Sequence, residues 1–202
     1  MPFGVEHTMQ TLVTERLMLE PLQQRHASEM FALLNDPALY QHLDYGPPAT
    51  LEHLVDVYRQ LEARRSPDGS EGWLNWIVRA DGRALGYVQA TVLGAGLAWV
   101  GYVMGRNAWG RGFAREAVGA MLSHLQEAHG VRHILASVEV ANDRSIRLLE
   151  RLQFHTADAA EASGHELSAS ERLYVLSAPA PAALRQAPPR GSRKPGSGPS
   201  FP

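Results

Sequence analysis

The stretch Gly101-Tyr-Val-Met-Gly-Arg-Asn-Ala-Trp-Gly-Arg-Gly-Phe-Ala-Arg-Glu-Ala117 decides the fold and carries the main functional signal. The apolar run over residues 99–104 predicts a buried strand, and a loop, a Gly-Arg-Gly turn and an amphipathic helix follow it. Unpaired N–H groups and the helix dipole favour an anion at a helix N-terminus, and glycine lets a ligand approach the backbone. We therefore expect a phosphate-bearing ligand on residues 110–114.

Two common phosphate-binding motifs do not match this turn. A nucleotide-triphosphate loop requires Gly-x-x-x-x-Gly-Lys-Ser/Thr, but the only lysine of the chain is Lys194. A dinucleotide fingerprint requires Gly-x-Gly-x-x-Gly, and Arg115 stands where its third glycine belongs. Taken alone, the turn also fits a strand-to-helix connection whose glycines serve close packing only.

Composition indicates one soluble globular domain of ordinary apolar and charged content in this chain of 202 residues. No apolar run is long enough to span a membrane, and the N-terminus lacks a signal-peptide core. The chain has no cysteine, which excludes disulfides, thiolate zinc sites and a cysteine nucleophile and fits a cytoplasmic protein. No cysteine accompanies its histidines as a metal ligand, so we expect no metal.

Charge is distributed unevenly. The formal net charge is −2, and residues 179–202 carry Arg185, Arg190, Arg193 and Lys194 without any acid, so the remaining residues carry about −6. An acidic body does not suit nucleic acid, which binds basic surfaces. It suits an amine or the basic end of a peptide as partner.

Periodicity and turn residues predict the order of the elements. Residues 1–13 are expected to form a flexible lead-in, and the Pro/Gly/Ser-rich basic tail over residues 179–202 is expected to be disordered. Between them we expect strands over residues 16–22, 72–79, 84–93, 97–104, 133–140 and 171–177, and helices over residues 26–34, 51–64 and 143–152. A further helix follows the glycine turn, with Val118, Met121, Leu122 and Leu125 on its apolar face, and Gly130 ends it. This order predicts an α/β fold with helices on both faces of a sheet.

Three motifs resemble the GNAT acetyltransferase superfamily, in family order and spanning roughly residues 14–155. Residues 109–114, Trp-Gly-Arg-Gly-Phe-Ala, resemble its pyrophosphate-binding pattern Gln/Arg-x-x-Gly-x-Gly/Ala. Residues 142–154, Asn-Asp-Arg-Ser-Ile-Arg-Leu-Leu-Glu-Arg-Leu-Gln-Phe, are similar to the Asn-x-x-Ser-x-x-Leu-Leu-Glu-Lys-Leu-Gly-Phe of one branch. That branch contains the ribosomal-protein N-terminal (alanine/serine) N-acetyltransferases, and residues 14–22, Thr-Glu-Arg-Leu-Met-Leu-Glu-Pro-Leu, resemble its opening strand.

The resemblance implies a GNAT domain over residues 14–178, with a mixed, mostly antiparallel sheet. Two central strands would splay apart to admit the pantetheine arm of acetyl-CoA, the implied co-substrate. The implied cofactor-binding residues include the main chain of Val103 and Met104 and the N–H groups of the loop. The full set is Val103, Met104, Gly110, Arg111, Gly112, Phe113, Ala114, Asn142 and Ser145. Asn142 is also a good helix N-cap, so both helix capping and cofactor contact are expected of it.

The proton donor is where this chain departs from the wider family. Many members carry a tyrosine seven residues after the asparagine, and Leu149 stands there. The resemblance makes Ser145 the candidate, because the branch places a serine near the CoA sulfur. The alternative is a serine that only caps its helix, in which case Tyr40, Tyr45 or Tyr102 is the next donor to consider.

The general base is less defined by the sequence. The carboxylate that the branch carries two residues before Gly101 is replaced by Trp99. Glu139 lies on the opposite strand and is our candidate, while His42, Asp44 and Glu71 lie in segments that line the acceptor side in the family. Gln153 replaces the glycine of Leu-Gly-Phe, and residues 155–170 do not resemble the family's continuation.

The leading functional hypothesis is an acetyl-CoA-dependent N-acetyltransferase that acts on a primary amine, of a protein N-terminus or a small molecule, in a ternary complex. A catalytically idle acyl-CoA-binding module is the alternative, because both the usual tyrosine and the strand carboxylate are missing. A nucleotide-binding protein of another fold is a third hypothesis. No nucleic acid or membrane partner is expected, and a homodimer stays open.

Overall fold

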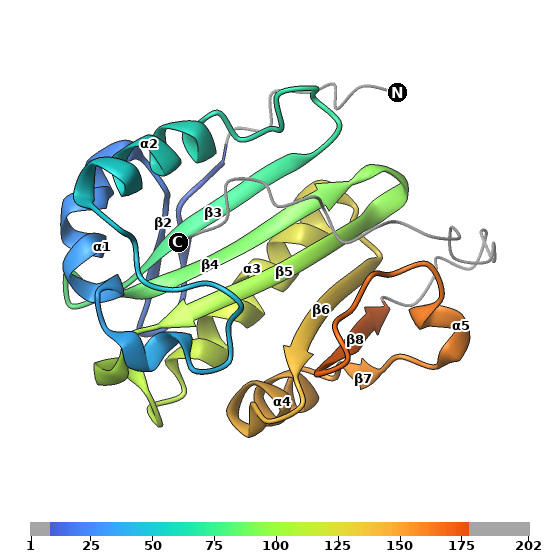
Figure 1. Ribbon diagram of the computed structural model, residues 1–202. Coiled ribbons are helices and arrows are strands. Elements are labelled where there is room, and N and C mark those ends of the chain that lie inside the picture. The colour runs from blue at the N-terminus through green and yellow to red at the C-terminus, as the bar shows by residue number, and fades with distance from the viewer. Residues whose placement is uncertain (1–8, 178–202) are drawn as a thin grey trace.

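An eight-stranded sheet forms the centre of the computed structural model, which describes residues 9–177 (Figure 1). Its order is β1-β2-β3-β4-β5-β6-β8-β7, and only β5 and β6 pair in parallel. The strands are β1 (Leu12–Val13), β2 (Met18–Pro21), β3 (Gly72–Ala80), β4 (Arg83–Leu93), β5 (Leu97–Met104), β6 (His133–Glu139), β7 (His155–Thr156) and β8 (Glu171–Ser177). The helices are α1 (Ala27–Leu34), α2 (Leu51–Glu62), α3 (Phe113–His129), α4 (Asp143–Arg151) and α5 (Ala159–Ala162).

Two hydrophobic cores lie on opposite faces of the sheet because side chains alternate along each strand. On one face Trp76 of β3 packs in the core that contains Met121 of α3. On the other face its neighbour Ile77 packs with Met30 of α1 and Leu54 of α2. Figure 1 shows α3 behind β4 and β5. Helices therefore cover both faces, and the fold class expected from the sequence is confirmed.

Local signals set several element boundaries as predicted. β5 has the predicted bounds, and α3 ends at Gly130, whose φ of 62° is left-handed. The β3–β4 hairpin turns on Asp81 and Gly82, which both have positive φ, the backbone that a tight two-residue hairpin requires.

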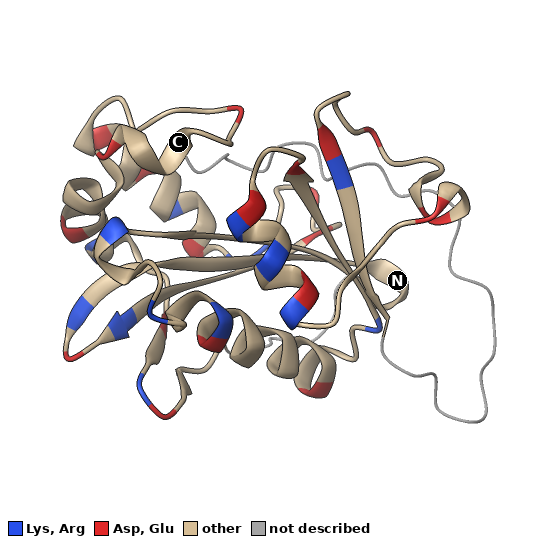
Figure 2. Cartoon of the chain, turned by 90° about the horizontal axis from the view of Figure 1, so that it is seen from below, with Lys and Arg blue, Asp and Glu red and all other residues tan. Residues whose placement is uncertain are grey.

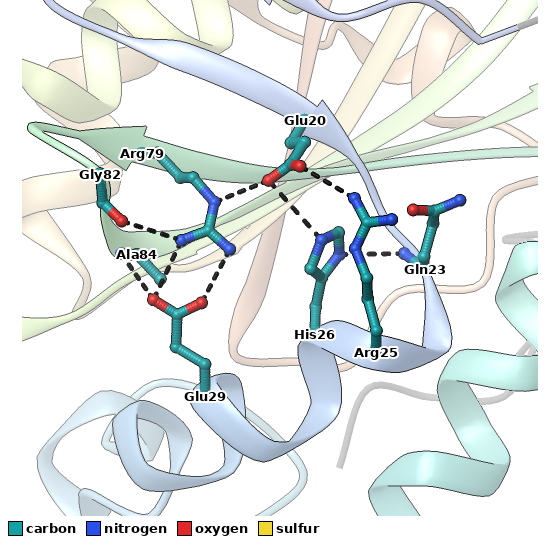
Figure 3. Close-up of polar contacts among 8 residues, drawn as sticks. All are labelled: Glu20, Gln23, Arg25, His26, Glu29, Arg79, Gly82 and Ala84. Carbon is teal, nitrogen blue, oxygen red and sulfur yellow. Dashed lines mark hydrogen bonds and ion pairs between the residues drawn. The ribbon is translucent and has the colours of Figure 1, made fainter.

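An ionic network fixes α1 against the β3–β4 hairpin (Figure 3). Arg79 donates from Nε to Glu20 at 2.7 Å and from Nη2 to Glu29 at 2.7 Å. Glu29 also accepts the N–H of Ala84 at 3.1 Å. These hydrogen bonds, those from Arg79 first, outweigh burial and hold the pKa of Glu29 below its usual value. The network sets the start of the segment that leads from α1 into the functional site.

Some features differ from the sequence expectations or extend them. The described part of the predicted lead-in is packed, because Met9 is buried and Leu12–Val13 pairs with β2. β7 and α5 lie in residues 155–170, where no element was predicted. Gln153 adopts a φ of 68°, so it takes the left-handed backbone for which the family uses glycine. The predicted tail over residues 179–202 lies outside the described residues.

Within residues 9–177, none of the helices is both long and apolar enough to cross a membrane.

Candidate functional site

The glycine-rich turn presents a row of backbone donors at the start of α3. Gly110 and Gly112 have φ of 71° and 78°, which turn the chain sharply into the helix. None of the N–H groups of residues 110–115 donates a hydrogen bond to another described residue. A side-chain atom added at Gly110 would meet nothing within 4 Å, so the turn is open to a ligand. Free donors at a helix N-terminus form an anion site.

The opening segment of the domain holds this turn in place. Glu116, in the first turn of α3, accepts the hydroxyl of Thr14 at 2.6 Å and the backbone N–H of Arg16 at 2.9 Å. The guanidinium of Arg16 pairs with the same carboxylate at 2.6 Å and donates to the carbonyl of Arg111 at 3.1 Å. Burial would raise the pKa of Glu116, but these hydrogen bonds outweigh it and lower the pKa. The Thr14–Arg16 motif therefore anchors the loop.

Trp109 stands at the first position of the loop motif and joins three elements. Its indole N–H donates to the carbonyl of Met104 at the end of β5, at 2.7 Å. The guanidinium of Arg144 on α4 lies 4.2 Å from the centre of the indole ring. Figure 2 looks onto α4 and shows acidic and basic residues interleaved along that helix.

The strands β5 and β6 diverge next to this loop (Figure 1). They pair only over Leu97–Trp99 of β5, although β5 continues to Met104 and β6 to Glu139. A cavity of about 780 Å³ lies at the divergence. It is lined by both strands, by residues 41–45 after α1, by α4 and by residues 166–171. The splayed central strands expected from the resemblance are confirmed.

The main chain of β5 faces the opening at alternate residues. Gly105 donates its N–H to Leu85 at 2.8 Å, and the carbonyl of Val103 lies against Gly86 of β4. Since successive peptide groups of a strand point to opposite sides, Tyr102 and Met104 direct their main chain toward the opening. Val103 instead contributes its side chain to the cavity lining.

At the start of α4, Asn142 and Ser145 lie side by side. The side-chain oxygen of Asn142 accepts the N–H of Ser145 at 3.1 Å, so Asn142 is the N-cap of the helix. Both residues also line the cavity. The capping role of Asn142 is therefore confirmed, and its position leaves contact with a ligand open.

A histidine–carboxylate pair spans the opening on the side of α1 and α2. His42 Nδ1 lies 2.9 Å from Oε2 of Glu139, and both residues line the cavity. The side chains are 35% and 33% exposed, so solvent can exchange protons with the pair. Because a carboxylate only accepts, Nδ1 is assigned as the protonated nitrogen and Nε2 keeps its lone pair.

The remaining acceptor-side candidates separate into two groups. Asp44 lines the cavity, as do Glu166, which lies in the segment 155–170 without family resemblance, and Glu171 at the start of β8. Glu71 does not line the cavity. Its carboxylate accepts the indole N–H of Trp73 at 2.9 Å. The described lining contains no lysine or arginine, so its charge is acidic.

A split sheet with a row of free amide donors beside the split is a geometry that suits a long ligand with a phosphate at one end. The model of the acetyltransferase (GNAT) domain matches residues 16–155. The chain therefore belongs to the GNAT acetyltransferase family, and the expected enzyme class, an acyltransferase, is confirmed.

Similar proteins of known sequence come from Bacillus. The chain is 30% identical over 148 residues to an uncharacterized N-acetyltransferase, p20, of Bacillus licheniformis, covering 72% of this chain and 83% of p20. It is 25% identical over 163 residues to YkkB of Bacillus subtilis, covering 71% and 84%.

Solved structures share the fold at lower identity. RimL, a ribosomal L7/L12 alpha-N-protein acetyltransferase in complex with coenzyme A, superposes with a TM-score of 0.70 at 16% identity, covering 83% of this chain and 98% of RimL. The self-immunity acetyltransferase MccE in complex with acetyl-CoA and AMP gives 0.68 at 16% identity, covering 82% and 94%.

Proposed function

We propose that this protein is an acetyl-CoA-dependent N-acetyltransferase that transfers an acetyl group to a primary amine by direct attack in a ternary complex. The observation that carries the proposal is the open amide loop that follows β5 directly, together with the cavity where β5 and β6 diverge. Structural neighbours solved in complex with coenzyme A or acetyl-CoA support this co-substrate.

In this proposal the backbone holds the cofactor. The N–H groups of Gly110, Arg111, Gly112, Phe113 and Ala114 bind the pyrophosphate, and the Arg111 side chain adds a positive charge. The main chain of Met104 and the side chain of Val103 contact the pantetheine arm, and Asn142 contacts it from α4. Such a bound thioester is held for attack, which removes much of the entropic cost of the reaction.

His42 and Glu139 act as the general base in the proposed mechanism. The incoming amine nitrogen attacks the thioester carbonyl, and Nε2 of His42 accepts a proton from that nitrogen. Glu139 orients the ring through Nδ1 and stabilises the positive charge that the imidazole gains. Glu139, our candidate base from the sequence, thus acts through His42.

Ser145 assists the departure of the thiolate in the proposed mechanism. Its hydroxyl lies in the first turn of α4 and faces the cavity, where it can donate to the sulfur as charge develops. Ser145→Ala should then lower turnover about 10- to 100-fold with little change in acetyl-CoA affinity.

The acceptor in this proposal is a primary amine of a protein N-terminus or of a small molecule. The acidic lining by Asp44, Glu139, Glu166 and Glu171 supports it, because carboxylates attract an ammonium group.

Thiol release from acetyl-CoA, measured with the full chain and a panel of alkylamines, diamines and peptides with free N-termini, tests the function. We expect at least one acceptor to stimulate release, and His42→Gln to lower that turnover by about 10²- to 10⁴-fold. His53→Gln, an exposed histidine on α2, is the matched control and should leave turnover unchanged.

An idle acyl-CoA-binding module is the second candidate, and two residues favour it. Leu149 is fully buried where many family members carry a tyrosine, and Trp99 replaces the strand carboxylate. Binding of acetyl-CoA without turnover of any acceptor would establish this candidate and refute the proposed acetyltransferase activity.

A further inference from the structure

The phenol of Tyr102 is a buried polar group that the proposed mechanism does not use. Its hydroxyl oxygen is shielded from solvent and has no hydrogen-bond partner among residues 9–177. Leaving a buried hydroxyl without a partner destabilises the fold. Such a cost indicates a group whose partner arrives with a ligand.

Tyr102 lies beside the split between β5 and β6, through which the proposed function passes the thioester arm. Tyr102 follows Trp99, the last residue of β5 that pairs with β6. The Tyr102 side chain lines the cavity together with Ser145 and Leu149 of α4. Strand alternation puts Tyr102 on the same face as Val100, toward α3 and α4. His42 and Glu139 lie on the other face, on the acceptor side.

The hydroxyls of Tyr102 and Ser145 approach one another from opposite sides of the split. Burial raises the pKa of Tyr102 to about 12, and the nearby Ser145 hydroxyl opposes that shift. The two oxygens do not form a hydrogen bond that would satisfy the phenol. At neutral pH the phenol therefore keeps its proton and has it available for another acceptor.

We propose that Tyr102 is a further catalytic residue, which donates a hydrogen bond to the sulfur of acetyl-CoA as the thiolate leaves. This inference rests on the proposed acetyltransferase function. The donor thus comes from β5, in place of the tyrosine that Leu149 replaces on α4.

The step is balanced without a further reactant. The tetrahedral adduct breaks its C–S bond, the electron pair moves to sulfur, and the amide product retains the acetyl carbon. The nitrogen proton goes to His42, and the phenol hydrogen bond stabilises the thiolate, which then takes a proton from water. Ser145 supplies a second donor to the same sulfur, as two donors do in an oxyanion hole.

The test compares Tyr102→Phe with the wild type and with Tyr174→Phe. Tyr174 is a buried tyrosine of β8 that does not line the cavity, so its variant controls for the loss of a phenol hydroxyl. We expect Tyr102→Phe to lower kcat about 10- to 100-fold, while Kd for acetyl-CoA stays within twofold. Its melting temperature should equal or exceed that of the wild type, because an unpartnered hydroxyl is removed.

Unchanged kcat in a folded Tyr102→Phe protein would overturn the inference, and so would an equal loss in kcat and in acetyl-CoA affinity. Either result leaves the acetyltransferase function intact if the wild type turns over. An inactive wild type that binds acetyl-CoA refutes the function itself. The Tyr102→Phe/Ser145→Ala double variant adds a check, since two donors to one sulfur should be non-additive.

Discussion

Gly112→Val is the sharpest perturbation of the cofactor loop, and it has a matched control at the other end of α3. Gly112 and Gly130 have φ of 78° and 62°, a backbone that a β-branched residue strongly disfavours. Each substitution should therefore cost about 1–2 kcal/mol of stability. An added side-chain atom meets nothing within 4 Å at Gly130 and only the Arg16 guanidinium, at 3.4 Å, at Gly112.

The two variants differ in what their side chains face. The valine at position 112 would stand at the N-cap of α3, within the loop of free N–H groups, whereas Gly130 is the C-cap of α3. Loss of one charge-assisted hydrogen bond to the pyrophosphate removes about 1.5–3 kcal/mol. Since ~1.4 kcal/mol is a factor of ten, acetyl-CoA affinity should fall at least about tenfold in Gly112→Val.

Isothermal titration with acetyl-CoA measures the affinity, and urea unfolding measures the stability of the same samples. We expect similar stability losses in both variants and a loss of affinity in Gly112→Val alone. An unchanged affinity in a folded Gly112→Val protein would remove the loop from the binding site. Equal affinity losses in both variants would assign the effect to strain in α3.

Three further changes test the scaffold around the site. Gln153→Gly should raise the free energy of unfolding by about 1 kcal/mol, because glycine adopts the left-handed backbone without strain, and a loss of stability in urea would contradict this. Glu116→Gln should lower stability by about 1 kcal/mol and weaken acetyl-CoA binding, because the group that accepts from Thr14 and Arg16 loses its negative charge. Unchanged stability and unchanged affinity would refute the anchoring role. Burial lowers the pKa of His26 below 6.5, so the unfolded chain binds its proton first and the free energy of unfolding should decline as pH falls below about 6.5. His26→Gln should flatten that slope in urea titrations, and an equal slope in both proteins would exclude His26 as its source.

Local signals explain why the loop proposed to bind the cofactor could be located from the sequence. The strand, the turn and the helix N-terminus follow one another within residues 97–117, so periodicity and glycine positions alone locate them. The Asn142 cap is equally local, since it bonds the N–H of Ser145 three residues on. These contacts need no knowledge of which distant segments meet.

The acceptor half depends on contacts between distant segments. His42 and Glu139 are 97 positions apart, and no periodicity or spacing rule joins residues so far apart. The anchoring of Glu116 by Arg16 has the same character. One missed element did carry a readable signal, because Asp158 and Glu161 form a capping box at the start of α5.

The substitution at the head of the loop motif shows how a local departure can be offset by a distant residue. Tryptophan in place of Gln/Arg removes a long polar side chain at position 109. The Trp109 indole N–H still anchors the loop to Met104, and the Arg144 guanidinium stacked over its ring keeps a positive charge beside the turn. Since Arg144 lies in the α4 motif, the two family motifs meet at this contact between the guanidinium and the indole ring. The tryptophan is therefore compatible with an anion site, and its cation now comes from the helix that also carries Ser145.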